Sequence, residues 1–401
     1  MVEKIEIERL PIQIIDGDRG KNYPHQNELL EKGDCLFLSA KNVTSNGFLF
    51  TEKQFITADK DALLRNGKLC RGDIVITTRG TVGNVAYYDN DVPFENVRIN
   101  SGMLIVRCNN SICREYVYNV LRSDSFLTQI KSIQTGSAQP QLPKSHFLKM
   151  KIPVPELDVQ KKVAGIIGDI DKKIAINTKI NNNLLQQASS IFKAWFIDPD
   201  ISEHEDWQMV TLEDITSLVT RGIAPKYSDE SDQIVINQKC IRDHMLDLSP
   251  ARKHLPKKIN EKWLKKGDLL INSTGQGTLG RAAQIWFDPV NMTVDSHVTI
   301  VRPKNEKLIY YIGIWGILHE REIESLHTGS TGQTELPRDR VKGLELLLPD
   351  ENALDQFNSV VKPITEFIIS NQNENIRLAD LRDSLLPKLM SGEIDISDID
   401  L

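Results

Sequence analysis

The sequence predicts an α+β protein in which two mixed α/β globular domains are separated by two long helices packed as an antiparallel coiled coil. Three observations support this fold class. Sequence segments recur at an offset of about 195 residues, runs of apolar residues lie beside glycine turns in both copies, and a long apolar stripe at helical spacing follows each copy. The fold is therefore expected to carry a pseudo-two-fold internal repeat.

The repeat consists of short matching segments that occur in the same order in both halves. Gly72–Ile76 recurs as Gly267–Ile271, and Gly80–Gly83 recurs as Gly277–Gly280 after a two-residue insertion. Three further matches complete the series, namely Asn100-Ser101 with Asp295-Ser296, Thr135-Gly136-Ser137 with Thr328-Gly329-Ser330, and Pro155 with Pro349. Five matches in one order indicate a duplication, whereas a single match would be weak evidence.

Each copy begins with a mixed α/β pattern. The continuous apolar runs at 73–77 and 268–272 predict buried strands, and a second strand is expected after each glycine turn, at 84–88 and 282–287. Residues 116–133 and 308–326 are expected to form helices that end in Gly-Ser loops.

A long helix is predicted after each module, because apolar residues recur there every three or four positions. The first runs from about Val159 to Phe196. Such helices should pack on each other, and an antiparallel pair would hold the modules at opposite ends. The predicted seam consists of Ile170, Ile174, Asn177, Asn181, Leu184, Ile191, Ile364, Ile368, Asn371, Asn375, Leu378 and Leu385.

Asn177 and Asn371 fall near the midpoints of the two stripes, at equivalent positions of the repeat. We expect them to meet across the seam and to fix the register. The alternative is that both face solvent where the seam opens. The expected domain boundaries are 1–155 for the first module, 156–198 for the central helix, 199–349 for the second module, 350–392 for the C-terminal helix and 393–401 for an acidic tail.

Composition excludes several classes of protein. No stretch reaches the ~20 apolar residues needed to span a bilayer, and the charged N-terminus lacks a signal-peptide core, so a cytoplasmic protein without membrane contact is expected. The five cysteines include no C-x-x-C pair, and the histidines include no H-E-x-x-H motif. We therefore expect reduced, mostly buried thiols and no metal site.

The net charge of −6 does not by itself indicate a nucleic-acid binder. However, the charge is unevenly distributed, because residues 349–401 hold four basic and eleven acidic groups and account for the whole deficit. A nearly neutral chain can bind DNA if partner subunits supply phosphate contacts. The acidic tail is interpreted as a solvated terminus or a partner contact.

Gly275–Gly280 matches G-x-G-x-x-G after a strand, which would suggest a nucleotide-dependent enzyme. That site needs a helix next, whereas residues 281–287 predict a strand. The glycines are more typical of a tight turn. With no P-loop, no Gly-x-Ser-x-Gly motif and no paired histidines, the sequence shows no catalytic residues.

Four segments, at 17–24, 71–83, 189–196 and 385–394, together with the repeat, resemble the specificity subunit of type I restriction-modification enzymes. The resemblance covers nearly the whole chain. It implies that each module is a target-recognition domain for one half of a split double-stranded DNA sequence, and that the helices set the spacer. It also implies two modification (methyltransferase) subunits that bind S-adenosylmethionine, and motor-nuclease restriction subunits that use ATP with Mg. This chain would hold no cofactor itself.

Base reading needs polar side chains that reach the groove edges. Residues shared by both modules suit phosphate contacts or turns, whereas unshared residues such as Asn22 or Gln238 suit base reading. The candidate DNA-binding residues are Lys21, Asn22, Lys41, Asn42, Arg79, Thr81 and Gln139 in the first module, and Arg221, Lys226, Gln238, Lys239, Gln276, Thr278 and Gln333 in the second. Thr81 and Thr278 serve equally well as turn residues.

Two other functions remain open at this point. The near-neutral charge permits a scaffold protein whose two modules bind protein partners instead of DNA. A nucleotide-dependent enzyme that uses Gly275–Gly280 would be stabilised against heat by its ligand.

Overall fold

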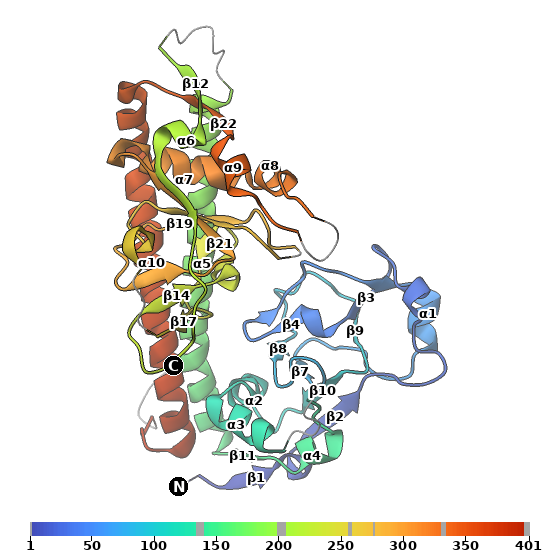
Figure 1. Cartoon of the computed structure of the whole chain (residues 1–401). Helices are drawn as coiled ribbons and strands as arrows, with labels where there is room; N and C mark the ends of the chain where they lie inside the picture. The colour runs from blue at the N-terminus through green and yellow to red at the C-terminus, as the bar shows by residue number, and fades with distance from the viewer. Residues whose placement is uncertain are drawn as a thin grey trace. The chain divides into compact units, whose positions relative to one another are not determined.

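The computed structural model describes residues 2–133, 140–198, 206–255, 259–275, 277–329 and 334–396 (Figure 1). The chain forms two compact units. One contains residues 1–175 and 375–401, and the other contains residues 176–374. Each unit therefore contains one module and a part of both long helices.

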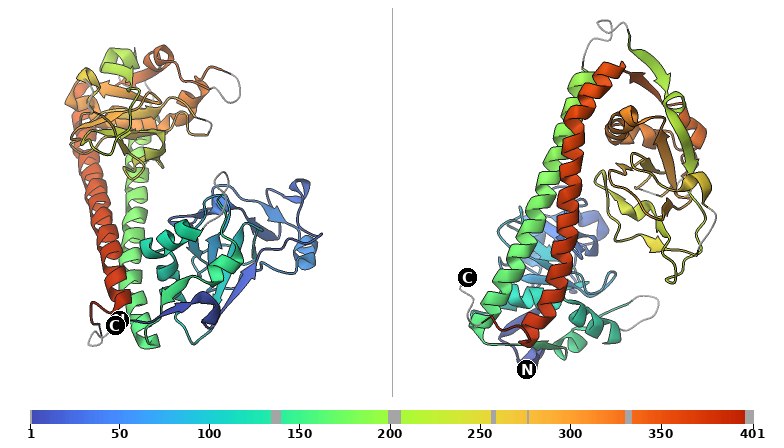
Figure 2. Two further views of the ribbon diagram at one scale, coloured as in Figure 1. Left: turned by 60° about the horizontal axis from the view of Figure 1, so that its bottom comes forward. Right: turned by 90° about the vertical axis from the view of Figure 1, so that its left-hand side faces the viewer.

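The two long helices are α5 (Leu157–Phe196) and α10 (Glu351–Ser391), which pack along each other (Figures 1 and 2). Their contacts show that they are antiparallel. Asp171 accepts a hydrogen bond from Arg382 at 3.1 Å, Asn181 pairs with Asn371, and the rings of Phe192 and Phe357 lie 5.7 Å apart. The 40 residues of α5 span about 60 Å.

All twelve predicted seam residues are buried or half-buried. Asn177, Asn181, Ile368 and Asn371 are the buried ones. Several deeply buried apolar residues of α5 lie outside this set, and two of them, Leu185 and Phe192, follow the predicted seam residues Leu184 and Ile191 by one position. This shift arises because the helix also packs against the globular modules, so its buried stripe is wider than a two-helix seam.

The predicted contact between Asn177 and Asn371 is wrong by one helical turn. Asn371 donates its side-chain amide to Oδ1 of Asn181 at 2.8 Å, whereas Asn177 donates to Oε2 of Glu374 at 2.6 Å. The asparagines do bond across the seam, but the antiparallel register places Glu374 next to Asn177.

In its described residues, the first module contains three sheets, a short hairpin and four α-helices. In the central sheet the order is β2-β10-β7-β8, and in the second sheet it is β6-β3-β9. The elements are β1 (Lys4–Glu6), β2 (Ile12–Asp16), β3 (Cys35–Leu38), β4 (Val43–Thr44), β5 (Gly47–Phe48), β6 (Phe55–Ile56), α1 (Ala58–Leu63), β7 (Ile74–Thr77), β8 (Val85–Tyr87), β9 (Val97–Ile99), β10 (Met103–Cys108), α2 (Arg114–Leu121), α3 (Asp124–Ile133), α4 (Lys144–Leu148) and β11 (Lys151–Pro153).

The second module repeats this topology strand for strand. Its central sheet has the order β13-β21-β18-β19, its second sheet β17-β14-β20, and β12 pairs with β22 as β1 pairs with β11. The elements are β12 (Gln208–Thr211), α6 (Leu212–Ile215), β13 (Thr216–Arg221), β14 (Ile234–Ile236), β15 (Ile241–Arg242), β16 (Met245–Leu246), β17 (Arg252–Lys253), β18 (Leu269–Asn272), β19 (Ala282–Gln284), β20 (Met292–Val294), β21 (Val298–Pro303), α7 (Ile309–Leu318), α8 (Glu320–Ser325), α9 (Arg338–Lys342) and β22 (Glu345–Leu348).

The central strands are buried on both faces, as their continuous apolar sequences predict. In β7, Ile74 and Ile76 pack with the long helices and with α2 and α3, whereas Val75 packs against the second sheet. In β18, Leu269 and Leu270 divide in the same way between two cores. Each module is therefore fixed on the helix pair through one face of its central sheet.

The two helices predicted within the modules are each interrupted. Residues 116–133 divide into α2 and α3 because the backbone carbonyl of Ser123 accepts the amides of Phe126 and Leu127 and starts a new helix. Residues 308–326 divide into α7 and α8 at His319, whose ring contacts the Trp315 carbonyl at 2.7 Å.

All five cysteines are free, and two of them, Cys35 and Cys240, are buried. Burial raises the pKa of the Cys240 thiol to about 11, so that thiol stays neutral at physiological pH. Among the described residues, no helix is long and apolar enough to cross a membrane.

Candidate nucleic-acid interface

Four loops converge at one end of the first module. They follow β2, β3 and β7 and include the turn between β9 and β10. A Cβ atom at Gly17 would lie 2.0 Å from the Asn100 carbonyl oxygen, so only glycine fits there. The Thr78 amide donates to the Gly102 carbonyl at 2.7 Å, and Asn84 donates its side-chain amide to Val43 at 2.9 Å. These contacts hold residues 17–22, 39–43, 78–84 and 100–102 together.

The equivalent loops converge in the second module. A Cβ atom at Gly222 would lie 1.9 Å from the Val294 carbonyl oxygen. The Ser273 amide donates to the His297 carbonyl at 2.8 Å, as Thr78 does to Gly102. Asn272 donates its side chain to the Gln238 carbonyl at 3.1 Å. The same end of both modules therefore presents the same four loops.

The repeated glycines form the tight turn in the third of these loops. Gly80 and Gly83 have φ of 75° and 94°, and Gly277 and Gly280 have φ of 74° and 83°, a conformation that favours glycine. Strand β19 begins at Ala282, just after the turn, at the place where a dinucleotide site needs a helix N-terminus to hold the pyrophosphate. The prediction that these glycines form a tight turn is confirmed.

In each module an arginine pairs with a buried aspartate at the start of β7 or β18, at the opposite end of the strand from these loops. Arg107 binds Asp73 through two nitrogens at 2.8 and 2.7 Å, and Arg302 binds Asp268 through two nitrogens at 2.7 Å each. Each aspartate also accepts a backbone amide three residues earlier in the chain. This repeated network fixes the tight turn that precedes β7 or β18.

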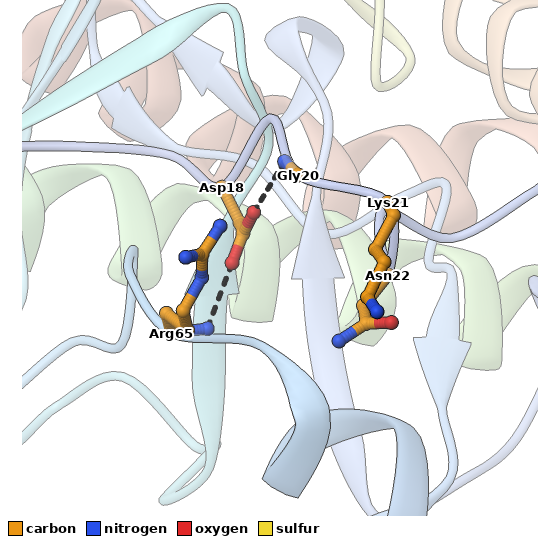
Figure 3. A pocket seen from close by; sticks show the side chains of 5 residues that line it. All are labelled: Asp18, Gly20, Lys21, Asn22 and Arg65. Atoms are coloured by element: carbon orange, nitrogen blue, oxygen red, sulfur yellow. Dashed lines mark hydrogen bonds between the residues drawn. The ribbon is translucent and has the colours of Figure 1, made fainter.

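A pocket of about 390 Å³ lies beside the first loop of the first module and is lined by Asp18, Gly20, Lys21, Asn22 and Arg65 (Figure 3). The buried Asp18 carboxylate accepts the backbone amides of Gly20 at 2.6 Å and Arg65 at 2.7 Å. Burial raises the pKa of Asp18, but the hydrogen bonds outweigh it and leave the pKa below its usual value. Asp18 thus ties the loop that carries Lys21 to the loop at Arg65.

Most of the predicted residues of the first module lie on these loops. Lys21, Lys41, Arg79 and Thr81 are exposed, and Lys41 forms an ion pair with Glu52 at 2.7 Å. Asn22 is half-buried and donates to the Leu63 carbonyl at 3.2 Å. Gln139 lies outside the described residues.

Asn42 was predicted to bind DNA, and its surroundings in the structure contradict this prediction. Its side chain is 2% exposed, and its amide donates to the carbonyls of Leu49 at 3.0 Å and Glu52 at 2.7 Å. Its Oδ1 accepts the Ser39 amide at 2.9 Å. Because these hydrogen bonds satisfy the side chain inside the fold, Asn42 shapes its loop and does not present itself to a ligand.

In the second module, Lys226 and Lys239 are exposed, and Gln238 and Thr278 are half-buried. The Thr278 hydroxyl donates to two backbone carbonyls of its own turn, those of Thr274 at 3.4 Å and Gly275 at 3.3 Å. Thr278 therefore has the role of a turn residue. Arg221 is half-buried, pairs with Glu335 and donates to the Leu336 carbonyl at 2.8 Å, so its guanidinium serves the module internally. Gln276 and Gln333 lie outside the described residues.

Sequence reasoning missed two polar residues of the second module, Thr274 and His297. The Thr274 hydroxyl lies 2.7 Å from Nδ1 of His297 and 3.4 Å from Oε1 of Gln238. One signal was present in the sequence, because His297 directly follows the repeated segment Asp295-Ser296. The residue at the equivalent place in the first module is Gly102, so the pair does not appear as a repeat.

Comparison with known proteins gives a consistent result. The family model described as "Type I restriction modification DNA specificity domain" matches residues 13–186 and 204–378. The chain is 24% identical over 395 residues to the type I restriction enzyme MjaIX specificity subunit of Methanocaldococcus jannaschii, covering 92% of this chain and 88% of that protein. It is 23% identical over 456 residues to the HindI specificity subunit of Haemophilus influenzae, covering 94% and 98%.

The fold is also similar to a solved structure. The S subunit of a type I restriction-modification system from M. genitalium superposes with a TM-score of 0.53 at 14% identity, covering 96% of this chain and 95% of that one. The two matched family domains correspond to the two modules with repeated topology and together span most of the sequence. The chain therefore belongs to the family of type I restriction-modification specificity subunits, non-catalytic subunits that recognise the DNA target through two recognition domains.

Proposed function

We propose that each module reads one half of a bipartite double-stranded DNA target through the four loops at the carboxyl ends of its strands. One observation carries the proposal. The two modules hold the same four loops in the same hydrogen-bonded frame, but most of the exposed side chains on these loops differ. A shared frame with different side chains suits two readers of two different half-sites.

Contacts to the DNA backbone are assigned to side chains that both modules share. Lys41 and Lys239 occupy equivalent exposed positions on 3₁₀ turns that follow β3 and β14. An exposed lysine at the same place in both readers suits a phosphate, which carries no sequence information. Lys21 and Lys226, exposed on the loops after β2 and β13, extend this set.

We also propose that this chain assembles with modification and restriction subunits. Two modification subunits that bind S-adenosylmethionine would dock on this chain and methylate adenine, and restriction subunits that use ATP with Mg would join for cleavage, in the cytoplasm where the DNA lies. The long helices offer apolar contact residues for such docking. Ile176 of α5 is 53% exposed and Phe367 of α10 is 51% exposed, which is unusual for large apolar side chains.

The test maps methylated adenines in cells that express the full chain with its modification subunits. Replacement of residues 1–150 by the matching module of a related subunit is expected to change one half-site and to leave the other half-site and the spacer intact. A methylated motif that does not depend on this chain would contradict DNA reading. Co-purification with proteins other than modification subunits would instead favour the scaffold function.

A further inference from the structure

Three positions around the glycine turn are equivalent in the two modules, and the hydrogen-bond register proves the equivalence. Thr77 pairs with Met103 across β7 and β10, as Asn272 pairs with Val298 across β18 and β21. Residues 79 and 141 form a β-bridge, as do residues 274 and 335. Arg79 is thus equivalent to Thr274, and Gly102 to His297.

The third position lies on the 3₁₀ turn after the parallel strand of the second sheet. Leu38 pairs with Ile99 as Ile236 pairs with Val294, so the turns begin at Ala40 and Gln238. Ala40 is therefore equivalent to Gln238.

In the first module, one of these positions holds the long cationic side chain of Arg79, and the other two hold the small residues Ala40 and Gly102. A Cβ atom at Gly80 would lie 3.7 Å from the Ala40 Cβ, and one at Gly102 would lie 3.5 Å from the Arg79 Cβ. Arg79 is exposed, and in the described part of the chain its guanidinium has no ion pair or hydrogen bond. Alanine and glycine on either side leave the guanidinium free to approach a ligand edge-on.

In the second module, the same three positions hold a polar chain. Gln238, Thr274 and His297 are linked by contacts of 3.4 Å and 2.7 Å through the Thr274 hydroxyl. A Cβ atom at Gly275 would lie 2.8 Å from Oε1 of Gln238, so the amide lies directly against the turn. The network orients the amide and the imidazole before any ligand arrives, which reduces the ordering cost of binding.

We infer that these three positions, 40, 79 and 102 in the first module and 238, 274 and 297 in the second, determine which base each module selects next to the glycine turn. The inference rests on the proposed reading of DNA by these loops. The frame around the positions is repeated down to single backbone hydrogen bonds, while the side chains on it differ completely. A guanidinium suits the O6 and N7 acceptors of guanine, and a glutamine amide suits the N6 and N7 groups of adenine.

The experiment exchanges the three side chains within the full chain. The variant Ala40→Gln, Arg79→Thr and Gly102→His is purified with its modification subunits, and methylation is sequenced on a double-stranded DNA library randomised across both half-sites. The φ of Gly102 lies outside the left-handed region, and a Cβ atom there would lie 3.2 Å from Oδ1 of Asn100, so the Asn100 side chain must shift slightly to admit a histidine. The expected result is a loss of guanine preference of about 10- to 100-fold at one position of the first half-site, with the second half-site unchanged.

The reciprocal variant, Gln238→Ala, Thr274→Arg and His297→Gly, is expected to change the second half-site only. The single variant Arg79→Thr tests the same position on an exposed side chain if the triple variant does not fold. An unchanged motif in Arg79→Thr would overturn the inference.

A charge-reversed control distinguishes that failure from a failure of the proposed function. The variant Lys21→Glu with Lys41→Glu is expected to weaken DNA binding by the complex while keeping the motif. If this control weakens binding but the exchange variants leave the motif unchanged, the loops bind DNA and the three positions do not select bases. If neither variant changes binding or motif, the proposed DNA reading by these loops also fails.

Discussion

The side-chain amide of Asn371 in α10 donates a hydrogen bond of 2.8 Å to Oδ1 of Asn181 in α5, and Asn181 in turn donates to the Ile368 carbonyl at 3.3 Å. Both asparagines are buried, at 6% and 2% exposure. In an apolar seam, such a pair selects one register, because a shift by one turn would leave buried amides without partners.

Replacing Asn371 by leucine removes the donor and leaves Oδ1 of Asn181 buried. We expect the free energy of unfolding of the full chain to fall by about 1–3 kcal/mol, measured by urea denaturation with circular dichroism. The double variant Asn181→Leu, Asn371→Leu is expected to recover most of this loss, since both polar groups are gone. Additive effects of the two single changes would show that the bond does not couple the helices.

The buried pair of Asp268 and Arg302 leads to a second prediction, about stability. Asp268 is fully buried, and Arg302 also donates to the Trp263 carbonyl at 2.7 Å. Arg302→Met leaves a buried carboxylate without its cation. We therefore expect the free energy of unfolding to fall by about 3–5 kcal/mol, measured by thermal or urea denaturation.

The exposed pair of Lys41 and Glu52 is the matched control, because both side chains are mostly in solvent. Lys41→Met is expected to change stability by less than about 1 kcal/mol. Equal effects of the two substitutions would mean that the buried pair does not anchor the tight turn before β18.

The repeated features of the fold were the predictable ones. Both apolar strands, both glycine turns and both long helices follow from short-range patterns, and each appears twice in the sequence. The break of a helix at Ser123 was missed, because it depends on one capping hydrogen-bond set within an otherwise helical pattern.

The site was predicted less completely, for a different physical reason. Composition placed Asn42 among the candidates, but its burial depends on the loop that folds over it from Leu49 to Glu52. Thr274 and His297 become neighbours only through the pairing of β18 with β21, which no local pattern reveals. The residues that we propose to read bases differ between the two modules, so the duplication that revealed the fold could not reveal them.

Partner docking on the long helices gives a third prediction. Phe367 and Val360 are 51% and 39% exposed and lie seven residues apart, on one face of α10. Phe367→Ser is expected to weaken binding of the modification subunit at least tenfold in a pull-down or by calorimetry, without lowering stability. Val290→Ser, at a 70% exposed position in the loop before β20, is the control and should bind normally. Normal binding by Phe367→Ser would place the docking surface elsewhere.

The pair of His244 and Glu320 predicts a pH dependence of the second module. Nδ1 of His244 lies 3.1 Å from Oε1 of Glu320, and this oxygen also accepts the Ala282 amide at 2.6 Å, at the start of β19. The hydrogen bond to Glu320 raises the pKa of His244, with smaller contributions from the charges of Glu320 and Asp243 and against the effect of burial.

Because the folded state holds the proton more tightly than the unfolded state, the pair stabilises the module fully below the ordinary histidine pKa of about 6.5. This stabilisation is lost as the pH rises through the raised pKa of the folded state. We expect an NMR titration of the His244 ring in the full chain to give a pKa above 6.5, and Glu320→Gln to return it toward that value. The Ala282 amide should also exchange faster at high pH in the native chain than below pH 6.5, once intrinsic exchange is corrected. A His244 pKa that Glu320→Gln does not change would contradict this account, since the glutamine keeps the size of the side chain and replaces the carboxylate by a neutral amide.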